Sequence, residues 1–265
     1  YAFDSTTIDL CLSVFWWAKF RKNKGGIKVH TLYDVETQIP AFFHITEASV
    51  HDSKVMIEIP YEPSSYYIFD RGYNNFKMLY KIHQIEAYFV VRAKKNLGYK
   101  SIQWKRRLPK NVLSDASVLL TGFYPKQYYP EPLRLVKYWD EEQEREFIFI
   151  TNAMHISALQ VAELYKNRWQ VELFFKWLKQ HLKIKRFWGT TENAVRIQIY
   201  AAICAYCLVA IIQHDMQLDR STYEVLQILS ISLTDKTHLR DLFNKTKFQN
   251  DKERFGPNGP RLFNF

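Results

Sequence analysis

The sequence is poor in cysteine, and it contains neither a secretion signal nor a stretch typical of a membrane span. Its 265 residues include only three cysteines, too few for a disulfide framework, so we expect a reducing compartment. The longest apolar run, residues 197–212, is interrupted by Gln198. It is also shorter than the roughly 20 residues needed to cross a bilayer. We therefore expect a core helix there and no membrane partner.

Zinc-binding and redox motifs are also lacking. Cys204 and Cys207 have the spacing of a redox pair or of half a zinc site, but no second cysteine pair accompanies them. The eight histidines form no zinc spacing such as His-x-x-x-His. We expect Cys204 and Cys207 to be buried helix cysteines.

Acidic residues are outnumbered by basic ones. There are 27 Asp and Glu against 37 Lys and Arg, which gives a formal net charge of +10. This excess favours a polyanionic partner, nucleic acid above all. Hydrophobic residues make up 47% of the chain, which is typical of a globular protein and not of a disordered tail. Because the chain begins with Tyr1 and not Met, we expect a fragment of a longer protein.

Strand-like runs dominate the first part of the chain. We expect strands at residues 1–10 (with an end or bend near Asp4), 27–33, 41–46, 66–69 and 87–92, and a helix at 75–83. Three consecutive strands with short turns predict an antiparallel meander. The order of strands and helices predicts an α/β fold, a mixed sheet with helices on its faces.

The middle of the chain changes character. Residues 96–150 are rich in proline and contain alternating runs at 117–123, 133–139 and 146–150. They predict a β-rich insertion into an α/β domain formed by residues 1–95 and 151–215. A second long helix is expected from Thr191 to His214, and residues 216–265 are expected to form a helical region and a tail.

Residues 157–188 contain neither Gly nor Pro, so we expect one long helix. At 100° per residue, Tyr165, Arg168, Glu172 and Lys179 fall within about 60° of one another, with Lys176 and Lys183 close to the same line. A neighbouring arc is apolar and predicts the buried face, formed by Leu164, Val171, Phe174, Phe175, Leu178 and Leu182. Alternatively, the charged line is a solvated face with pairs such as Glu172–Lys176.

Three carboxylates are candidates for a metal site. Phosphodiester cleavage is commonly served by two divalent ions, which prefer carboxylate oxygens. Asp4 on the first strand, Asp70 after the fourth and Glu172 on the late helix can meet if strands one and four are neighbours. Each has a simpler explanation, since Asp4 can belong to a turn and Asp70 can cap the helix after it.

These residues also resemble a known pattern. Tyr165-x2-Arg168-x3-Glu172-x6-Lys179 resembles the Y-R-E-K motif of DDE transposases of the insertion-sequence-four type. Asp4 in FDSTTI and Asp70 in YIFDRGY resemble the two catalytic aspartates of that family. His51-Asp52, in ASVHDSK between them, is also similar to the family. The resemblance covers roughly residues 1–215.

The resemblance implies an RNase H-like fold and two Mg2+ ions (or Mn2+) held by Asp4, Asp70 and Glu172. It implies cleavage of double-stranded DNA at transposon ends by water, followed by attack of the freed 3′-hydroxyl on target DNA, often through a hairpin. It further implies a dimer on DNA and a prokaryotic, cytoplasmic location near the nucleoid.

The same resemblance implies residues that contact DNA. Tyr165, Arg168 and Lys179 would contact phosphates, and Lys176 and Lys183 lie near the same line. Arg71 either orients Asp70 or touches DNA. Trp139 is our choice to receive a flipped base, although Trp104, in a basic run, competes for that role.

Two other functions stay open. The first is a catalytically inactive or domesticated RNase H-like DNA-binding protein, against which the retention of all three acids argues. The second is a hydrolase with paired carboxylates, such as a glycosidase. It leaves the basic charge unexplained.

Overall fold

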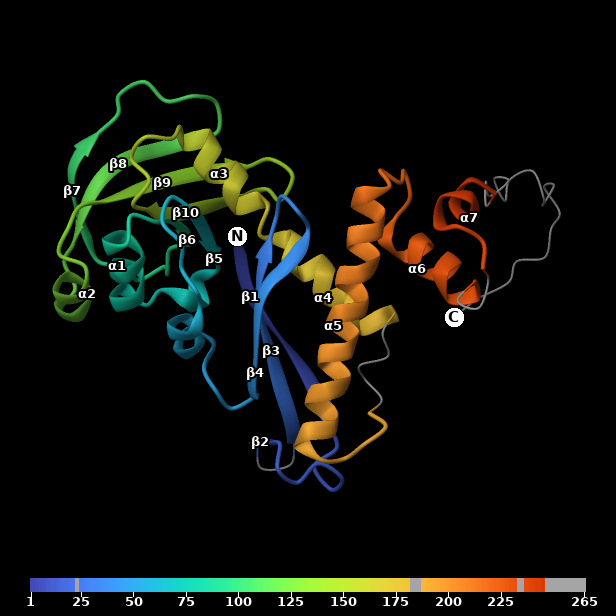
Figure 1. The fold of residues 1–265 in the computed structure, drawn as a ribbon. Coiled ribbons are helices and arrows are strands. Elements are labelled where there is room, and N and C mark those ends of the chain that lie inside the picture. Colours follow the sequence, from blue (N-terminus) through green and yellow to red (C-terminus); the bar gives the residue numbers. More distant parts are fainter. Residues whose placement is uncertain (22–23, 182–186, 233–235, 246–265) are drawn as a thin grey trace. The chain divides into compact units, whose positions relative to one another are not determined.

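The computed structural model describes residues 1–21, 24–181, 187–232 and 236–245 (Figure 1). By its internal contacts the chain forms two compact units, Tyr1–Cys207 and Leu208–Phe265. The first unit contains the strands β1 (Ala2–Leu10), β2 (Lys19–Arg21), β3 (Lys24–Asp34), β4 (Ile39–Glu47), β5 (Tyr66–Phe69), β6 (Tyr88–Arg92), β7 (Tyr99–Trp104), β8 (Val112–Leu120), β9 (Leu133–Asp140) and β10 (Arg145–Thr151). Its helices are η1 (Asp52–Glu58), η2 (Arg71–Tyr73), α1 (Phe76–Gln84), α2 (Phe123–Tyr128), α3 (Ala158–Lys166) and α4 (Trp169–His181), and α5 (Glu192–Asp215) begins in it.

The described strands form one mixed sheet of ten, in the order β2-β3-β1-β5-β6-β10-β9-β8-β7, with β4 paired to β3. The predicted mixed α/β sheet with flanking helices is confirmed. The predicted meander is confirmed too, because β1 pairs antiparallel with β3 and β3 antiparallel with β4. Strand β5 then pairs parallel with both β1 and β6, which requires the crossover helix α1 between β5 and β6.

Strand β1 does not end or bend near Asp4 as the sequence suggested. It pairs with β3 without interruption from Ala2 opposite Tyr33 to Leu10 opposite Gly25. The alternate side chains of Thr6, Ile8 and Leu10 are buried, as are Ala2 and Phe3 at the start of the strand, and this burial keeps the strand extended through its polar centre. Gly25 permits the close approach at the end, since a Cβ there would lie 3.0 Å from the Leu10 carbonyl oxygen.

Residues 96–150 are β-rich as expected, and their strands continue the same sheet. β10 pairs with β6 and β9, and β9 pairs with β8. A buried ion pair joins two of these strands: Arg134 donates to both carboxylate oxygens of Asp115 at 2.7 and 2.8 Å. The remaining donors of Arg134 bind the carbonyl oxygens of Ala153 and Ile156, which hold the chain that leads to α3.

The single long helix predicted for residues 157–188 is wrong. The helix breaks at Asn167 and Arg168, where backbone bonds of the i to i−3 type replace the regular ladder: the Arg168 N–H donates to the Tyr165 carbonyl (3.1 Å) and the Val171 N–H to the Arg168 carbonyl (3.3 Å). The break lets α3 and α4 pack on different parts of the core. α3 starts at a capping box formed by Ser157 and Gln160.

The predicted buried face is confirmed within α4. Val171, Phe174, Phe175 and Leu178 are buried, whereas Leu164 is half-buried. Leu182 lies outside the described residues. α4 packs against β1 and β3, as Figure 1 shows.

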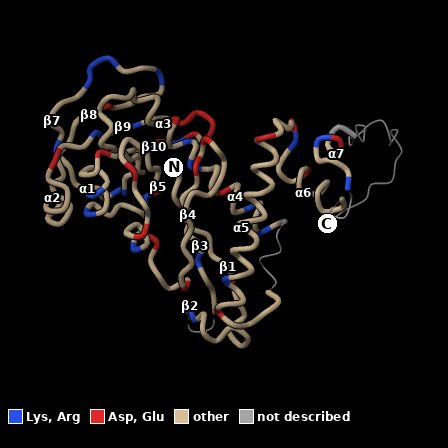
Figure 2. The backbone as a smooth tube through the Cα atoms, in the orientation of Figure 1, with Lys and Arg blue, Asp and Glu red and all other residues tan. Residues whose placement is uncertain are grey.

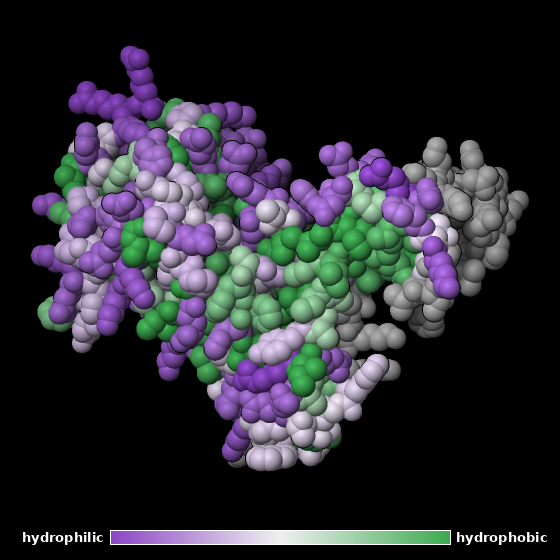
Figure 3. Space-filling view, in the orientation of Figure 1, coloured by the Kyte–Doolittle hydropathy of each residue, from purple (hydrophilic) through white to green (hydrophobic). Residues whose placement is uncertain are grey.

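Helix α5 confirms the predicted second helix. Val195, Ile199, Ile203 and Tyr206 are buried, and the Tyr206 hydroxyl lies 2.9 Å from that of Tyr33. Apolar side chains also gather on its surface (Figure 3), with Ile197 and Leu208 exposed. Among the described helices, α5 alone is long and apolar enough to cross a membrane by length and composition.

The prediction of buried cysteines on this helix is wrong for Cys204, which is exposed, whereas Cys207 is half-buried. Because α5 is apolar on nearly all sides, the sequence pattern does not define which face is buried.

The second unit contains α6 (Thr222–Ile231) and α7 (Leu239–Lys245). Val209, Val225, Ile228, Leu242 and Phe243 form its core.

Candidate active site

The first two acids follow neighbouring strands. β1 and β5 run parallel, with Phe3 opposite Phe69. Asp4 and Asp70 are the next residues along each strand, so the sheet places them side by side. Neither has the simpler role considered above. Asp4 lies within β1, and the Asp70 side chain makes no capping hydrogen bond to η2, while Asn75 caps α1.

Arg168 joins the third acid to the first. Its Nη1 donates to Asp4 Oδ2 at 2.7 Å and its Nη2 to Glu172 Oε1 at 2.5 Å. The helix break places Arg168 so that it faces β1 while Glu172 follows one turn later on α4. Arg168 Nε is buried and makes no hydrogen bond within the described part of the chain. The Arg168 guanidinium thus binds two carboxylates through Nη1 and Nη2, while its Nε donor has no partner among the described residues.

Tyr165 connects the second acid to this pair. Its hydroxyl donates to Asp70 Oδ1 at 3.1 Å, and its ring lies 5.7 Å from the Arg168 guanidinium carbon. Burial, together with the charge of Asp70, raises the pKa of Tyr165 to about 12. The hydroxyl thus stays protonated and remains a donor at neutral pH.

The carboxylates act on one another electrostatically. Burial raises the pKa of Asp4; with the opposing effect of Arg168 and the reinforcing charges of Glu172 and Asp70 included, the pKa lies at about 6. A site that concentrates negative charge in this way fits a divalent cation by its donor chemistry. Across residues 1–21, 24–181, 187–232 and 236–245, however, no three His, Cys, Asp or Glu side chains are close enough to hold a metal in the present arrangement. The guanidinium of Arg168 lies between Asp4 and Glu172.

A pocket of about 540 Å3 opens beside these acids. It is lined by residues of β1 and α4, namely Asp4, Ser5, Thr6, Glu172, Phe175, Lys176, Lys179 and Gln180. The predicted line of Glu172, Lys176 and Lys179 therefore faces a single cavity. Lys183 lies outside the described residues.

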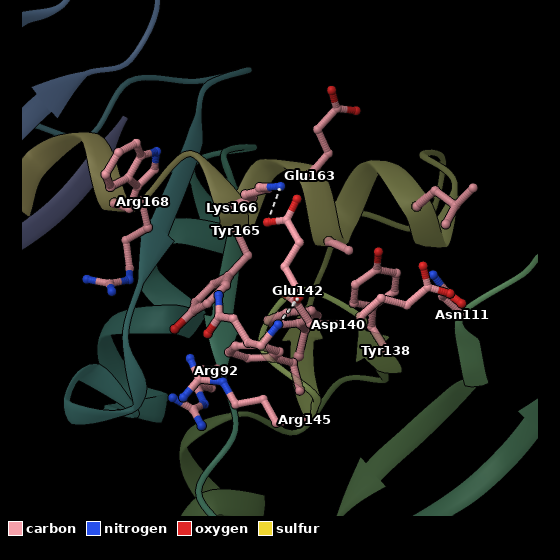
Figure 4. A pocket seen from close by; sticks show the side chains of 17 residues that line it. Arg92, Asn111, Tyr138, Asp140, Glu142, Arg145, Glu163, Tyr165, Lys166 and Arg168 are labelled. Atoms are coloured by element: carbon pink, nitrogen blue, oxygen red, sulfur yellow. Dashed lines mark hydrogen bonds and ion pairs between the residues drawn. The ribbon is translucent and has the colours of Figure 1, made fainter.

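A second pocket, of about 720 Å3, has Tyr165 and Arg168 among its lining residues (Figure 4). Arg92 and Arg145 line it, and both guanidinium groups lie over the Phe147 ring, at 4.9 and 4.3 Å from its centroid. Tyr138 and the exposed Trp169 line the same pocket. Cations and aromatic rings thus adjoin the residue that binds Asp70.

The remaining predicted residues within the described part of the chain line neither pocket. Trp139, on β9, lines neither pocket, whereas its neighbours Tyr138 and Asp140 line the second one. Arg71 begins η2 directly after Asp70 and is half-buried. His51 is an exposed N-cap, and its side chain accepts a hydrogen bond from the Ser53 N–H.

Sequence reasoning missed Arg92, Arg145 and Asp52. Arg92 is the last residue of a buried strand next to β5, and this position could have indicated it. Asp52 stands in the His51-Asp52 pair, but no local signal points to its partners Ser5 and Lys28, which are distant in the sequence.

The sheet brings two acids together on and directly after adjacent parallel strands, and a packed helix adds a third, an arrangement that fits a carboxylate-based enzyme. Comparison with known proteins is more specific. The family model described as transposase DDE domain matches residues 1–208. The chain therefore belongs to the transposase DDE domain family. Transposases act on DNA, and DDE transposases generally use divalent metal ions.

Named relatives agree with this assignment. The chain is 36% identical over 246 residues to a protein of Sinorhizobium fredii named as a transposase, an alignment that covers 90% of this chain and 67% of that protein. It is 31% identical to a protein of Geobacillus stearothermophilus named as an insertion sequence element transposase, with coverage of 77% and 54%. A Synechocystis protein named in the same way is 25% identical, with coverage of 89% and 67%. The chain thus spans between half and about two thirds of these relatives.

Proposed function

We propose that Asp4, Asp70 and Glu172 hold two Mg2+ ions (or Mn2+) and that the chain cleaves DNA at transposon ends and joins them to target DNA. The observation that carries this proposal is the pairing of Phe3 with Phe69, which places Asp4 beside Asp70, together with the bridge that Arg168 makes from Asp4 to Glu172. When bound, such ions activate the attacking oxygen and stabilise the leaving one.

The fold that we propose is RNase H-like. Support comes from the strand order β4-β3-β1-β5-β6, with an antiparallel meander followed by the parallel strands β1, β5 and β6. Residues 96–150 would be the insertion between Asp70 and Glu172. The spacing of Tyr165, Arg168, Glu172 and Lys179 supports membership of the Y-R-E-K subgroup.

DNA would lie along α4 and the adjacent pockets. Arg168, with its unpartnered Nε, suits a phosphate oxygen, and Lys176 and Lys179 face the 540 Å3 pocket. Lys183 and Arg71 would extend this contact. Basic residues also gather on the loop between β7 and β8 (Figure 2), which carries Lys105, Arg106, Arg107 and Lys110. This loop ends at Asn111, a lining residue of the 720 Å3 pocket, and gives a cationic path to the acids.

Within the site, each residue of the chain has a distinct task. Tyr165 orients Asp70 by donating to Oδ1 and stays protonated because burial raises its pKa. Arg168 balances the charge of Asp4 and Glu172, and by turning toward a phosphate it would leave their oxygens available to cations. The chain would act as a dimer on two DNA ends in a prokaryotic cytoplasm, with a hairpin intermediate. Tyr138 and Trp169, which line the 720 Å3 pocket, suit a flipped base better than Trp139 does.

Cleavage of supercoiled plasmid with Mg2+ or Mn2+ tests this function. We expect cleavage by the unsubstituted chain and none by Asp70→Ala, Asp4→Ala or Glu172→Gln. The matched control is Asp9→Ala, which removes an exposed carboxylate from the same strand as Asp4. If DNA binds in a salt-dependent manner but is never cut, the chain is an inactive DNA-binding relative. Equal cleavage by Asp70→Ala would refute the proposed site.

A further inference from the structure

A cluster of polar side chains lies on the face of β1 opposite to Asp4. Successive residues of a strand point to opposite faces, so Ser5 points away from the face where Asp4 meets Arg168. In the register of β1 and β3, Ser5 lies opposite His30 and Thr7 opposite Lys28. His30 and Lys28 therefore share the face of Ser5. Asp52, the first residue of η1, completes this group, which we call the Asp52 cluster: Ser5, Lys28, His30 and Asp52.

Asp52 is tied to β1 and β3 by short polar contacts. The Ser5 hydroxyl donates to Asp52 Oδ1 at 2.7 Å, and Lys28 Nζ lies 3.1 Å from the same oxygen. Lys28 also donates to the Val50 carbonyl at 2.8 Å, just before η1. The cluster thus fixes the segment that precedes η1 against the two strands.

The charges of the cluster balance within it. Although burial opposes ionisation, hydrogen bonds from Ser5 and Lys28 hold the pKa of Asp52 below its usual value. His30 is fully buried and its pKa is lowered to about 4 by burial, so it is neutral at pH 7. Lys28 is therefore the countercharge of Asp52. The pair carries no net charge.

A second hydrogen bond connects the cluster to the acid site. The backbone N–H of Ser5 donates to Asp4 Oδ1 at 2.8 Å. Ser5 therefore connects the two acids, because its hydroxyl donates to Asp52 and its backbone N–H donates to Asp4. Because β1 pairs with β3 on both sides of this peptide, the loss of the Ser5 anchor would leave the strand in place and would loosen only the local position of the Ser5 N–H against the Asp4 carboxylate.

We propose that Asp52 is a positioning residue, which acts through Ser5 to hold the Asp4 carboxylate in the orientation needed to bind a divalent cation. This inference rests on the proposed function of Asp4. Outer partners of metal-binding carboxylates typically contribute 10- to 100-fold in metal affinity.

Mn2+ binding, measured by electron paramagnetic resonance on the 265-residue chain, tests the role directly. We expect Asp52→Asn and Ser5→Ala each to weaken Mn2+ binding about 10-fold. Ser5→Thr, which keeps the hydroxyl, is expected to bind nearly as the unsubstituted chain does. The Mn2+ concentration for half-maximal plasmid cleavage should rise by the same factor. In the double variant the shift should not exceed the larger single shift, because both substitutions break one connection.

Asp34→Ala is the matched control. Asp34 is a carboxylate at the end of β3 that accepts hydrogen bonds from the Glu36 and Thr37 N–H groups, so its loss affects stability but not the acids. We expect its thermal midpoint to fall and its Mn2+ affinity to stay unchanged.

Three outcomes would overturn the inference. The first is unchanged Mn2+ binding in Asp52→Asn and Ser5→Ala while Asp4→Asn abolishes it. The second is complete loss of binding in Asp52→Asn, as in Asp4→Asn, which would make Asp52 a direct ligand. The third is an equal affinity shift in Asp34→Ala, which would make the effect one of stability. If Asp4→Asn itself binds Mn2+ normally, the proposed function fails instead.

Discussion

Replacement of Asp4 by Asn should make the metal-free protein more stable while abolishing its cleavage activity. Burial and the neighbouring carboxylates raise the pKa of Asp4 from 3.8 to about 6. Each pKa unit corresponds to ~1.4 kcal/mol, so the ionised side chain costs the folded state about 3 kcal/mol at pH 7. The amide of the Asp4→Asn variant carries no charge and does not incur this cost.

The difference in free energy of unfolding between the unsubstituted chain and Asp4→Asn should depend on pH. Because the pKa of Asp4 is higher in the folded than in the unfolded chain, the folded state binds more protons between pH 4 and pH 6. The free energy of unfolding of the unsubstituted chain therefore falls relative to that of Asp4→Asn as the pH rises through this window. We expect the two proteins to be equally stable near pH 4 and to differ by about 3 kcal/mol above pH 7.

Urea and thermal unfolding in EDTA, at several pH values, measure this difference. For a domain of this size about 3 kcal/mol corresponds to a rise of about 6–12 °C in the midpoint. Mg2+ should then raise the midpoint of the unsubstituted chain and leave that of Asp4→Asn unchanged. If Asp4→Asn were less stable at pH 7, the ion pair with Arg168 would outweigh burial, and the reasoning would be refuted.

Three further substitutions test other contacts. Tyr165→Phe removes one hydrogen bond to Asp70, worth about 1 kcal/mol, and should slow plasmid cleavage about fivefold with unchanged DNA affinity; unchanged kinetics would contradict the contact. Lys179→Ala should reduce the salt dependence of DNA binding by about one counterion, measured by fluorescence anisotropy from 50 to 200 mM salt, and an unaltered slope would exclude a phosphate contact. Arg134→Met removes the buried partner of Asp115, which keeps the exposed Lys105 at 3.0 Å, and should destabilise the chain by about 3 kcal/mol in urea unfolding, whereas the double variant Arg134→Met with Asp115→Leu should recover much of that loss.

The sheet and its first two acids could be predicted from the sequence because their signals are local. Aromatic and β-branched residues predict β1 and the short apolar run 66–69 predicts β5; Asp4 lies within the first strand and Asp70 directly follows the second. Once β1 and β5 pair, Asp4 and Asp70 lie side by side. The line from Glu172 to Lys179 was also predictable, since it lies within the single helix α4.

Other features depend on contacts that no local pattern encodes. The break at Asn167 carries neither Gly nor Pro; it arises because α3 packs on β5 and β6 while α4 packs on β1 and β3. The role of Asp52 depends on η1 folding onto strands that lie more than twenty residues earlier. The exposure of Cys204 depends on which side of an apolar helix meets the core.

The position of Arg168 has a consequence for the order of events on DNA. While Arg168 donates to Asp4 and Glu172, the same two nitrogens cannot donate to a phosphate. A movement of Arg168 toward a nucleic-acid strand would also remove the positive charge that lies beside Asp4 and Glu172. DNA binding and the need for a cation at these two acids would then follow from the same movement. Without a strand to draw it away, Arg168 would keep its single positive charge against these two carboxylates.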